Sequence, residues 1–205
     1  MDRNDFEPQL CIVQLTDFHF GEELQVNCHD RVDDILETIK SSITSGAVLL
    51  LVTGDIAYSG KKKEYQSASL FFDYLIEQLD KLEYRLIVYL LPGNHDLQGP
   101  RKSTERFVDT QYDLDVKKMA SFYEFANQYG NQFVLGQPDS ITFEVEGTQV
   151  SVSGFNSAPL STLVGDDKGF HLLRSFGSSL LGNTPDSGLH IFASHHGPEW
   201  FLDNG

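Results

Sequence analysis

The chain has 205 residues, 40% of them hydrophobic, and its 15 Lys and Arg against 30 Asp and Glu give a formal net charge of -15. This length and composition suit one compact α/β domain over residues 1–205 and exclude a disordered or collagen-like chain. The negative charge argues against non-specific binding to nucleic acid, although divalent cations at an acidic site would neutralise part of it.

The N-terminal segment, residues 1–8, is polar and acidic and lacks the basic start and apolar stretch of a secretory signal. The longest strictly apolar runs, 47–52 and 86–91, have six residues each, whereas a membrane-spanning helix needs roughly 20. We therefore expect a cytoplasmic protein without a membrane span. Two cysteines, Cys11 and Cys28, imply no disulfide framework.

The first half of the chain predicts a βαβ unit and a third strand. Residues 10–16 form an apolar, β-branched run that ends at a polar loop, as a buried parallel strand does. Helical spacing of apolar residues from Asp30 predicts an amphipathic helix that ends before Gly46. Residues 47–53 predict a second strand, apolar spacing over 70–82 predicts a second helix, and residues 86–91 predict a third strand.

The second half predicts fewer regular elements. Residues 97–112 are polar and predict a loop or lid, and 116–129 predict a helix. Alternation of apolar and polar residues over 141–146 and 149–152, around a turn at Gly147 and Thr148, predicts a β-hairpin. A helix is expected near 172–181, and a last strand over 189–193 leads to the sequence at 194–198.

Polar side chains with metal-ligand chemistry directly follow four of the predicted strands. Parallel strands bring such positions to one edge of a sheet, where open α/β folds bind their ligands. Carboxylate, imidazole and amide groups without thiolate suit manganese, iron or zinc, and a carboxylate between imidazoles can bridge two ions. The residues are Asp17, His19, Asp55, Asn94, His95, His195 and His196.

These residues fall into four ordered motifs that resemble those of the calcineurin-like metallophosphoesterases. The motifs read Asp-Phe-His at 17–19, Gly-Asp at 54–55, Gly-Asn-His-Asp at 93–96 and His-His-Gly-Pro at 195–198. One Asp-x-His alone is a weak signal, but four ordered motifs that each follow a strand are strong together. The resemblance spans residues 10 to about 200 and implies a four-layer α/β sandwich of two mixed β-sheets flanked by helices.

The resemblance also implies a role for each motif residue. Asp17 and His19 would bind one metal, Asp55 would bridge both, and Asn94 with His195 would bind the second. The two ions would lower the pKa of a bridging water for in-line attack on phosphorus.

His95 would be catalytic rather than a ligand, because it would face the leaving oxygen, where it stabilises charge or donates a proton. Asp96 is expected to belong to the same catalytic group as His95 and to act there as an anchor. His196 is expected to line the substrate cleft or to support the ligands, and Lys61 and Lys62 are expected to meet substrate phosphates.

The chain departs from the family after His196, because no further His follows, whereas the family has a final Gly-His-x-His motif that supplies one His to each metal. We expect that the chain is the N-terminal part of a longer protein with further C-terminal domains or protein partners. A degenerate site and a site completed by a partner or solvent are the alternatives.

The function expected from these motifs is metal-dependent hydrolysis of a phosphodiester: a nucleotide, a cyclic nucleotide or nucleic acid. Manganese is the first metal expected, with iron or zinc as alternatives. The Gly-Asp motif continues as Ile56-Ala57-Tyr58-Ser59, without the extension found in protein Ser/Thr phosphatases. A phosphomonoesterase is the second candidate, and a non-catalytic regulatory module that retains the fold is the third.

Overall fold

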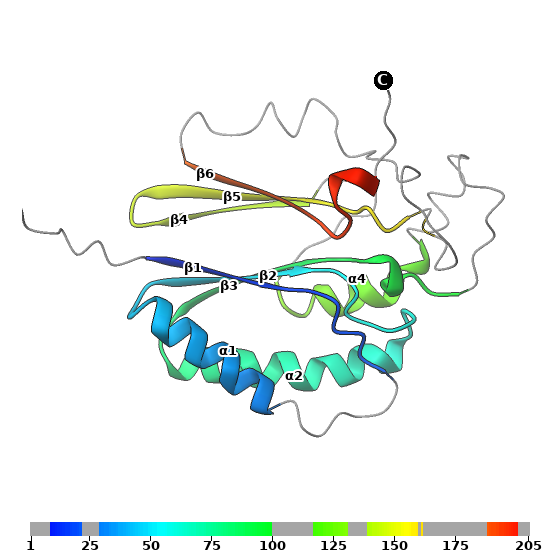
Figure 1. Cartoon of the computed structure of the whole chain (residues 1–205), viewed down its shortest axis with the longest axis horizontal. Coiled ribbons are helices and arrows are strands. Elements are labelled where there is room, and N and C mark those ends of the chain that lie inside the picture. The colour runs from blue at the N-terminus through cyan, green and yellow to red at the C-terminus, as the bar shows by residue number, and fades with distance from the viewer. Residues whose placement is uncertain are drawn as a thin grey trace, which may run out of the picture.

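The computed structural model describes residues 9–21, 29–99, 117–130, 139–159, 161 and 188–200. Two β-sheets face each other, and helices lie on the outer side of the first sheet (Figure 1). This arrangement confirms the predicted α/β sandwich of two sheets flanked by helices. The helix expected at 172–181 and most of the lid expected at 97–112 lie outside the described residues.

The first sheet has the order β1 (Leu10–Leu15), β2 (Ala47–Thr53), β3 (Arg85–Leu91), and its described strands are parallel. β2 is buried at every position. Its side chains alternate, so that Val48 and Leu50 pack with the helices, while Leu49 and Leu51 pack with the second sheet. Burial on both faces explains why the predicted strand is an uninterrupted apolar run.

The helices on the outer side of this sheet are α1 (His29–Ser42), α2 (Lys62–Lys81) and α4 (Ala120–Ala126). α2 begins at Lys62, well before the apolar residues that predicted it. The carboxylate of Glu64 accepts hydrogen bonds from the backbone N–H of Ser59 and Lys61 at 2.8 and 3.0 Å. These bonds satisfy donors that a helix start leaves without a partner, so the polar first turns are helical too.

The second sheet has the order β4 (Asp139–Val145), β5 (Thr148–Phe155), β6 (Leu189–Ser194). β4 and β5 form the predicted antiparallel hairpin, which turns one residue earlier than expected, at Glu146 and Gly147, both with positive φ. β5 continues to Phe155, past the predicted end at residue 152, because its small residues are buried against the first sheet; a Cβ on Gly154 would collide with Tyr89.

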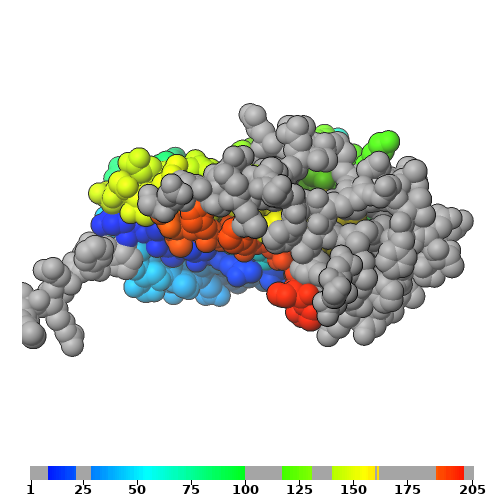
Figure 2. Space-filling model, turned by 90° about the horizontal axis from the view of Figure 1, so that it is seen from above, coloured from blue at the N-terminus to red at the C-terminus, as the bar shows by residue number. Residues whose placement is uncertain are grey.

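β6 is parallel to β5 and lies at the molecular surface, with the hairpin on one side and β1 and α1 on the other (Figure 2). Its carboxyl end, like those of β1, β2 and β3, leads into one of the polar motifs. In the part of the chain that the structure describes, no helix is both long and apolar enough to cross a membrane.

Candidate metal centre

The four polar motifs meet at the carboxyl ends of the strands. The loop after β1 lies beside the loop after β2, because the backbone N–H groups of Asp17 and His19 donate to the carbonyls of Gly54 and Asp55 at 3.2 and 3.0 Å. The loop after β3 joins them through the N–H of His95, which donates to Asp55 Oδ1 at 2.8 Å. Backbone hydrogen bonds therefore fix the places from which the site side chains project.

Three of these residues have an unusual backbone conformation. Asp17, His19 and Asp55 have φ of 55°, 51° and 54°, in the left-handed region that residues with a Cβ seldom adopt. Such conformations persist only where the surrounding contacts hold them, and they concentrate at functional sites. Here they turn the side chains of two neighbouring loops toward a common centre.

Two glycines let these loops approach closely. A Cβ on Gly54 would lie 2.6 Å from the Gly93 nitrogen and 2.7 Å from His195 Nδ1, and a Cβ on Gly93 would collide with the Asp55 side chain. Real Cβ atoms avoid such contacts, so the glycines of the Gly-Asp and Gly-Asn-His-Asp motifs are required by packing.

Asp55 lies at the centre of the site and is 3% exposed. Its Oδ1 accepts from the backbone of His95, while its Oδ2 lies 3.5 Å from His195 Nε2 and 3.8 Å from His19 Nε2. One carboxylate oxygen thus faces an imidazole on each side, an arrangement in which a carboxylate can serve two cations.

Among the residues that the structure describes, two groups of possible ligand atoms share the Asp55 carboxylate. One contains His19, Asp55 and His95, the other contains Asp17, Asp55 and His195, and in each group the ligand atoms lie within 4.8 Å of one another. His19 Nε2 is also 3.8 Å from Asp17 Oδ1. Separations of this size are too long for hydrogen bonds, but an ion that binds each ligand at about 2.0–2.2 Å spans them.

The surroundings of His195 test whether these residues fit a cation. Its Nδ1 lies 2.8 Å from the Thr53 carbonyl, which can only accept, so Nδ1 carries the proton. In the neutral ring Nε2 then presents a lone pair to Asn94 Oδ1 at 3.0 Å and to Asp55 Oδ2 at 3.5 Å. His195 Nε2, Asn94 Oδ1 and Asp55 Oδ2 are thus three acceptors that converge, and such a set fits a divalent cation. A backbone carbonyl that accepts from Nδ1, as that of Thr53 does, is a usual support of a metal-binding His.

His95 has the same support. Its Nδ1 lies 2.7 Å from the carbonyl of Tyr58 and donates to it, which leaves Nε2 for a ligand or a substrate. Its ring contacts that of His19 edge-on, with centroids 4.5 Å apart. The Nδ1 of His19 is buried and has no hydrogen-bond partner among the described residues. The sequence prediction excluded His95 from the ligands, whereas its place in one of the two groups also allows ligation.

Asp96 lies behind the site and is fully buried, so its carboxylate faces protein groups rather than a substrate. Four donors surround it: the backbone N–H groups of Ile56, Ala57 and Gly93, and the Tyr65 hydroxyl at 2.8 Å. Burial raises the pKa of the Asp96 carboxyl to about 6, and the backbone N–H groups of Ala57 and Gly93 oppose that rise. Asp96 therefore ties the loops after β2 and β3 to the start of α2, and its expected catalytic role stays a prediction.

His196 follows His195 but is only 7% exposed. Its Nδ1 and its backbone N–H lie 2.9 and 3.2 Å from Ser157 Oγ, and its ring packs between His195 and Trp200. Its burial suits a supporting role, but His196 also lines the cleft beside His195, so both expected roles stay predictions.

The lysines lie at the start of α2. Lys61 and Lys62 are exposed, and the Lys62 ammonium binds Glu124 at 2.7 Å, on α4. Their expected contact with substrate phosphates stays a prediction.

Several groups that support the site escaped the sequence analysis. Thr53 and Tyr58 act through backbone carbonyls, which no residue type signals. Ser157 follows β5, whose end was predicted too early in the chain. Tyr65 lies in the first turn of α2, which was not predicted to be helical. The polar pair Asn156-Ser157 directly after β5 was the available signal.

A cleft of about 630 Å³ opens beside His195, between β1 and β6. Ile12, Leu51 and Phe192 line its apolar part. Apolar surface therefore extends from the edge of the first sheet to the His195 end of the site.

Comparison with known proteins agrees with this geometry. The comparison with curated proteins found no match for the chain. The family model of the calcineurin-like phosphoesterases matches residues 11–204, which include all four motifs. The chain therefore belongs to the calcineurin-like phosphoesterase family and is a metal-dependent phosphoester hydrolase.

Proposed function

We propose that this hydrolase is a phosphodiesterase that binds two divalent ions, manganese first among them, and acts on nucleotides, cyclic nucleotides or nucleic acid. The observation that carries the proposal is the carboxylate of Asp55, which is shared by two groups of ligand atoms. The family resemblance assigns Asp17 and His19 to one ion and Asn94 and His195 to the other, whereas in the two groups Asp17 lies with His195 and His19 lies with His95. Nitrogen and oxygen ligands without thiolate suit manganese, iron and zinc.

The sequence after the Gly-Asp motif supports the diester assignment. This motif continues as Ile56-Ala57-Tyr58-Ser59, without the extension found in protein Ser/Thr phosphatases. Its absence argues against that class of phosphomonoesterase, and a phosphomonoesterase of another class is the second candidate function.

The reaction is hydrolysis in line with the scissile bond. A water oxygen bonds to phosphorus, the bond from phosphorus to the leaving oxygen breaks, and a proton passes to that oxygen. When bound, the two ions supply Lewis-acid polarisation of the phosphoryl oxygens and lower the pKa of water.

His95 is the proposed proton donor. The Tyr58 carbonyl holds its Nδ1, so Nε2 of the protonated ring can donate to the leaving oxygen.

The test of the diester assignment is turnover of bis-p-nitrophenyl phosphate and p-nitrophenyl phosphate with manganese and with chelator. We expect manganese-dependent turnover that is faster with the diester. Faster turnover of the monoester would make the protein a phosphomonoesterase, and no turnover of either compound would contradict the proposal. Iron and zinc in the same assay test the choice of metal.

The test of His95 is the His95→Ala variant on two diesters that differ in their leaving group. We expect kcat to fall by about 10²- to 10⁴-fold, and to fall more with phenol than with p-nitrophenol, because the poorer leaving group depends more on a proton. Equal losses together with lost manganese would identify His95 as a ligand instead. His29→Ala is the control, because His29 is exposed on α1.

A further inference from the structure

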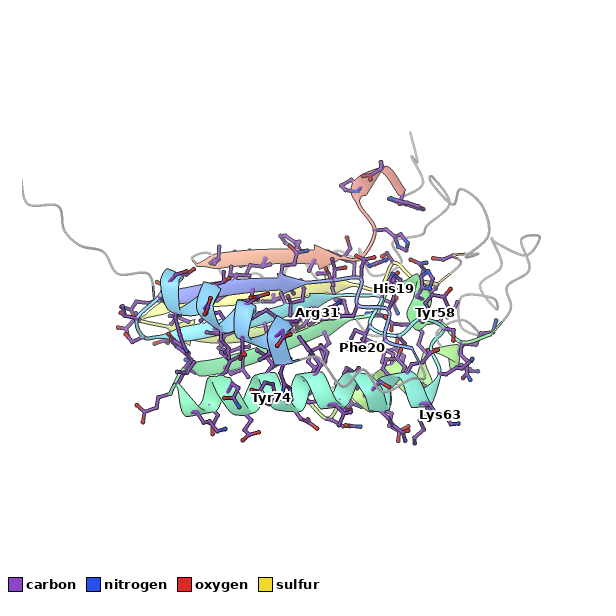
Figure 3. All side chains as sticks on the ribbon, turned by 60° about the horizontal axis from the view of Figure 1, so that its bottom comes forward. His19, Phe20, Arg31, Tyr58, Lys63 and Tyr74 are labelled. Atoms are coloured by element: carbon purple, nitrogen blue, oxygen red, sulfur yellow. The ribbon has the colours of Figure 1, made fainter. Side chains whose placement is uncertain are left out.

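Tyr58 is an exposed aromatic residue at the entrance of the metal centre. It is 61% exposed, and its ring centroid lies 6.2 Å from that of His19 and 5.7 Å from that of His95. Figure 3 shows Tyr58 and His19 at the same end of the molecule, on neighbouring loops. The ring therefore stands beside the imidazole that faces the leaving oxygen in the proposed function.

The backbone of Tyr58 is held on both sides. Its N–H donates to the carbonyl of Phe20 at 3.0 Å, and its own carbonyl accepts from His95 Nδ1 at 2.7 Å. These two hydrogen bonds hold the backbone of Tyr58, and so the point from which its ring projects beside His95. A Tyr side chain has only two χ angles, so it loses little conformational entropy when a ligand packs against it.

Packing of the core does not account for the Tyr58 ring. Tyr65, seven residues later, is 4% exposed and its hydroxyl donates to Asp96, so its ring is part of the core. Tyr58 belongs to neither core cluster, and its hydroxyl makes no hydrogen bond with the described residues. Its accessible face is therefore available to a ligand, next to the reacting group.

We propose that Tyr58 determines specificity by stacking on a planar aromatic ring carried by the leaving group of the ester. The inference rests on the proposed function, because it takes the His95 side of the centre as the leaving-group side. An aryl group and a nucleobase share the required chemistry, a flat π surface close to the phosphoryl group. Esters of purely aliphatic alcohols carry no ring, so stacking on Tyr58 would not strengthen their binding.

The test measures equilibrium binding by calorimetry, in the presence of manganese, so that it does not depend on turnover. Phenylphosphonate and methylphosphonate differ by a ring attached to phosphorus, and AMP and ribose 5-phosphate differ by a nucleobase. We expect Tyr58→Ala to weaken binding of the aromatic member of at least one pair by about tenfold, as loss of one stacking contact does. Binding of the non-aromatic members stays unchanged.

Two variants separate stacking from other roles of the side chain. Tyr58→Phe keeps the ring and is expected to bind like the wild type, whereas Tyr58→Leu keeps only apolar bulk and is expected to behave like Tyr58→Ala. Leu70→Ala, which removes another exposed apolar side chain, on α2, is the matched control and should change nothing.

The outcomes distinguish this inference from the proposed function. If the wild type binds all four compounds and Tyr58→Ala leaves every affinity unchanged, the stacking role is wrong and the phosphoryl site stands. If the wild type binds none of them with manganese, the role of Tyr58 fails, and turnover of bis-p-nitrophenyl phosphate then decides whether the proposed function fails with it. An effect confined to AMP identifies a nucleobase, and one confined to phenylphosphonate identifies an aryl group.

Discussion

At the scale of single residues, Asp96 shows how a buried charge organises the site. Its two oxygens accept from four donors, a set that suits a carboxylate because it has acceptors only. Asp96→Asn would turn an amide NH₂ toward these donors. We expect the free energy of unfolding to fall by about 1–3 kcal/mol, measured by urea denaturation. Asp33→Asn, on the exposed face of α1, is the control; equal stabilities of the two variants would contradict this role.

Ser157 is the second residue whose contacts predict a measurable effect. Its hydroxyl is the partner of both the ring and the backbone N–H of buried His196. Ser157→Ala leaves these groups without that partner, and we expect a loss of about 1–3 kcal/mol in the free energy of unfolding. Ser41→Ala, at an exposed position, should stay within about 0.5 kcal/mol of the wild type. A Ser157 variant as stable as that control would show that His196 does not need the hydroxyl.

The sequence predicted the chemistry of the site better than its supports. The types and order of Asp17, His19, Asp55 and His195 were visible because each side chain follows a strand. The acceptors that orient the imidazoles were not visible, since the carbonyls of Thr53 and Tyr58 belong to the backbone and any residue type carries one.

At the scale of elements, the approach of the loops after β2 and β3 depends on glycine. Gly93→Ala would place a methyl group against the Asp55 side chain and backbone nitrogen, and we expect a loss of about 1–3 kcal/mol in stability, together with weaker manganese binding. Gly21→Ala is the matched control, because a Cβ there meets nothing within 4 Å and neither glycine has a positive φ. Thermal unfolding of both variants tests the prediction, which an unchanged Gly93→Ala variant would contradict.

The elements themselves were predictable where burial leaves a periodic pattern. β2 was predicted with its observed bounds because both of its faces are buried and its apolar run is unbroken. The start of α2 was missed because Glu64, Ser59 and backbone donors stabilise a polar turn. The end of β5 was missed because buried Ser153 and Gly154 read as polar or flexible in the sequence.

At the scale of the whole molecule, the net charge of -15 and the converging carboxylates of the site both destabilise the folded state through electrostatic repulsion. Bound divalent cations would offset part of this repulsion and would bind the folded state alone. We expect manganese to raise the melting temperature, with a gain of about 2.7 kcal/mol at a concentration 100 times its Kd. Chelator should reverse the shift. A melting temperature that is the same with manganese and with chelator would contradict a metal site formed by the fold.

Strands that alternate with helices predicted the parallel sheet, whereas the second sheet was expected only from the family resemblance. The pairing of β6 parallel to β5 was not predictable from local pattern, because it joins segments far apart in the chain. That pairing brings His195 to the same centre as Asp55.

The most direct test of this account is the amount of manganese bound at saturation by the wild type and by Asp55→Asn, measured by elemental analysis after equilibrium dialysis. Because the Asp55 carboxylate is shared by both groups of ligand atoms, we predict two manganese ions per chain in the wild type and loss of both in the variant. An Asp55→Asn protein that binds as much manganese as the wild type, with the same affinity, would contradict the account.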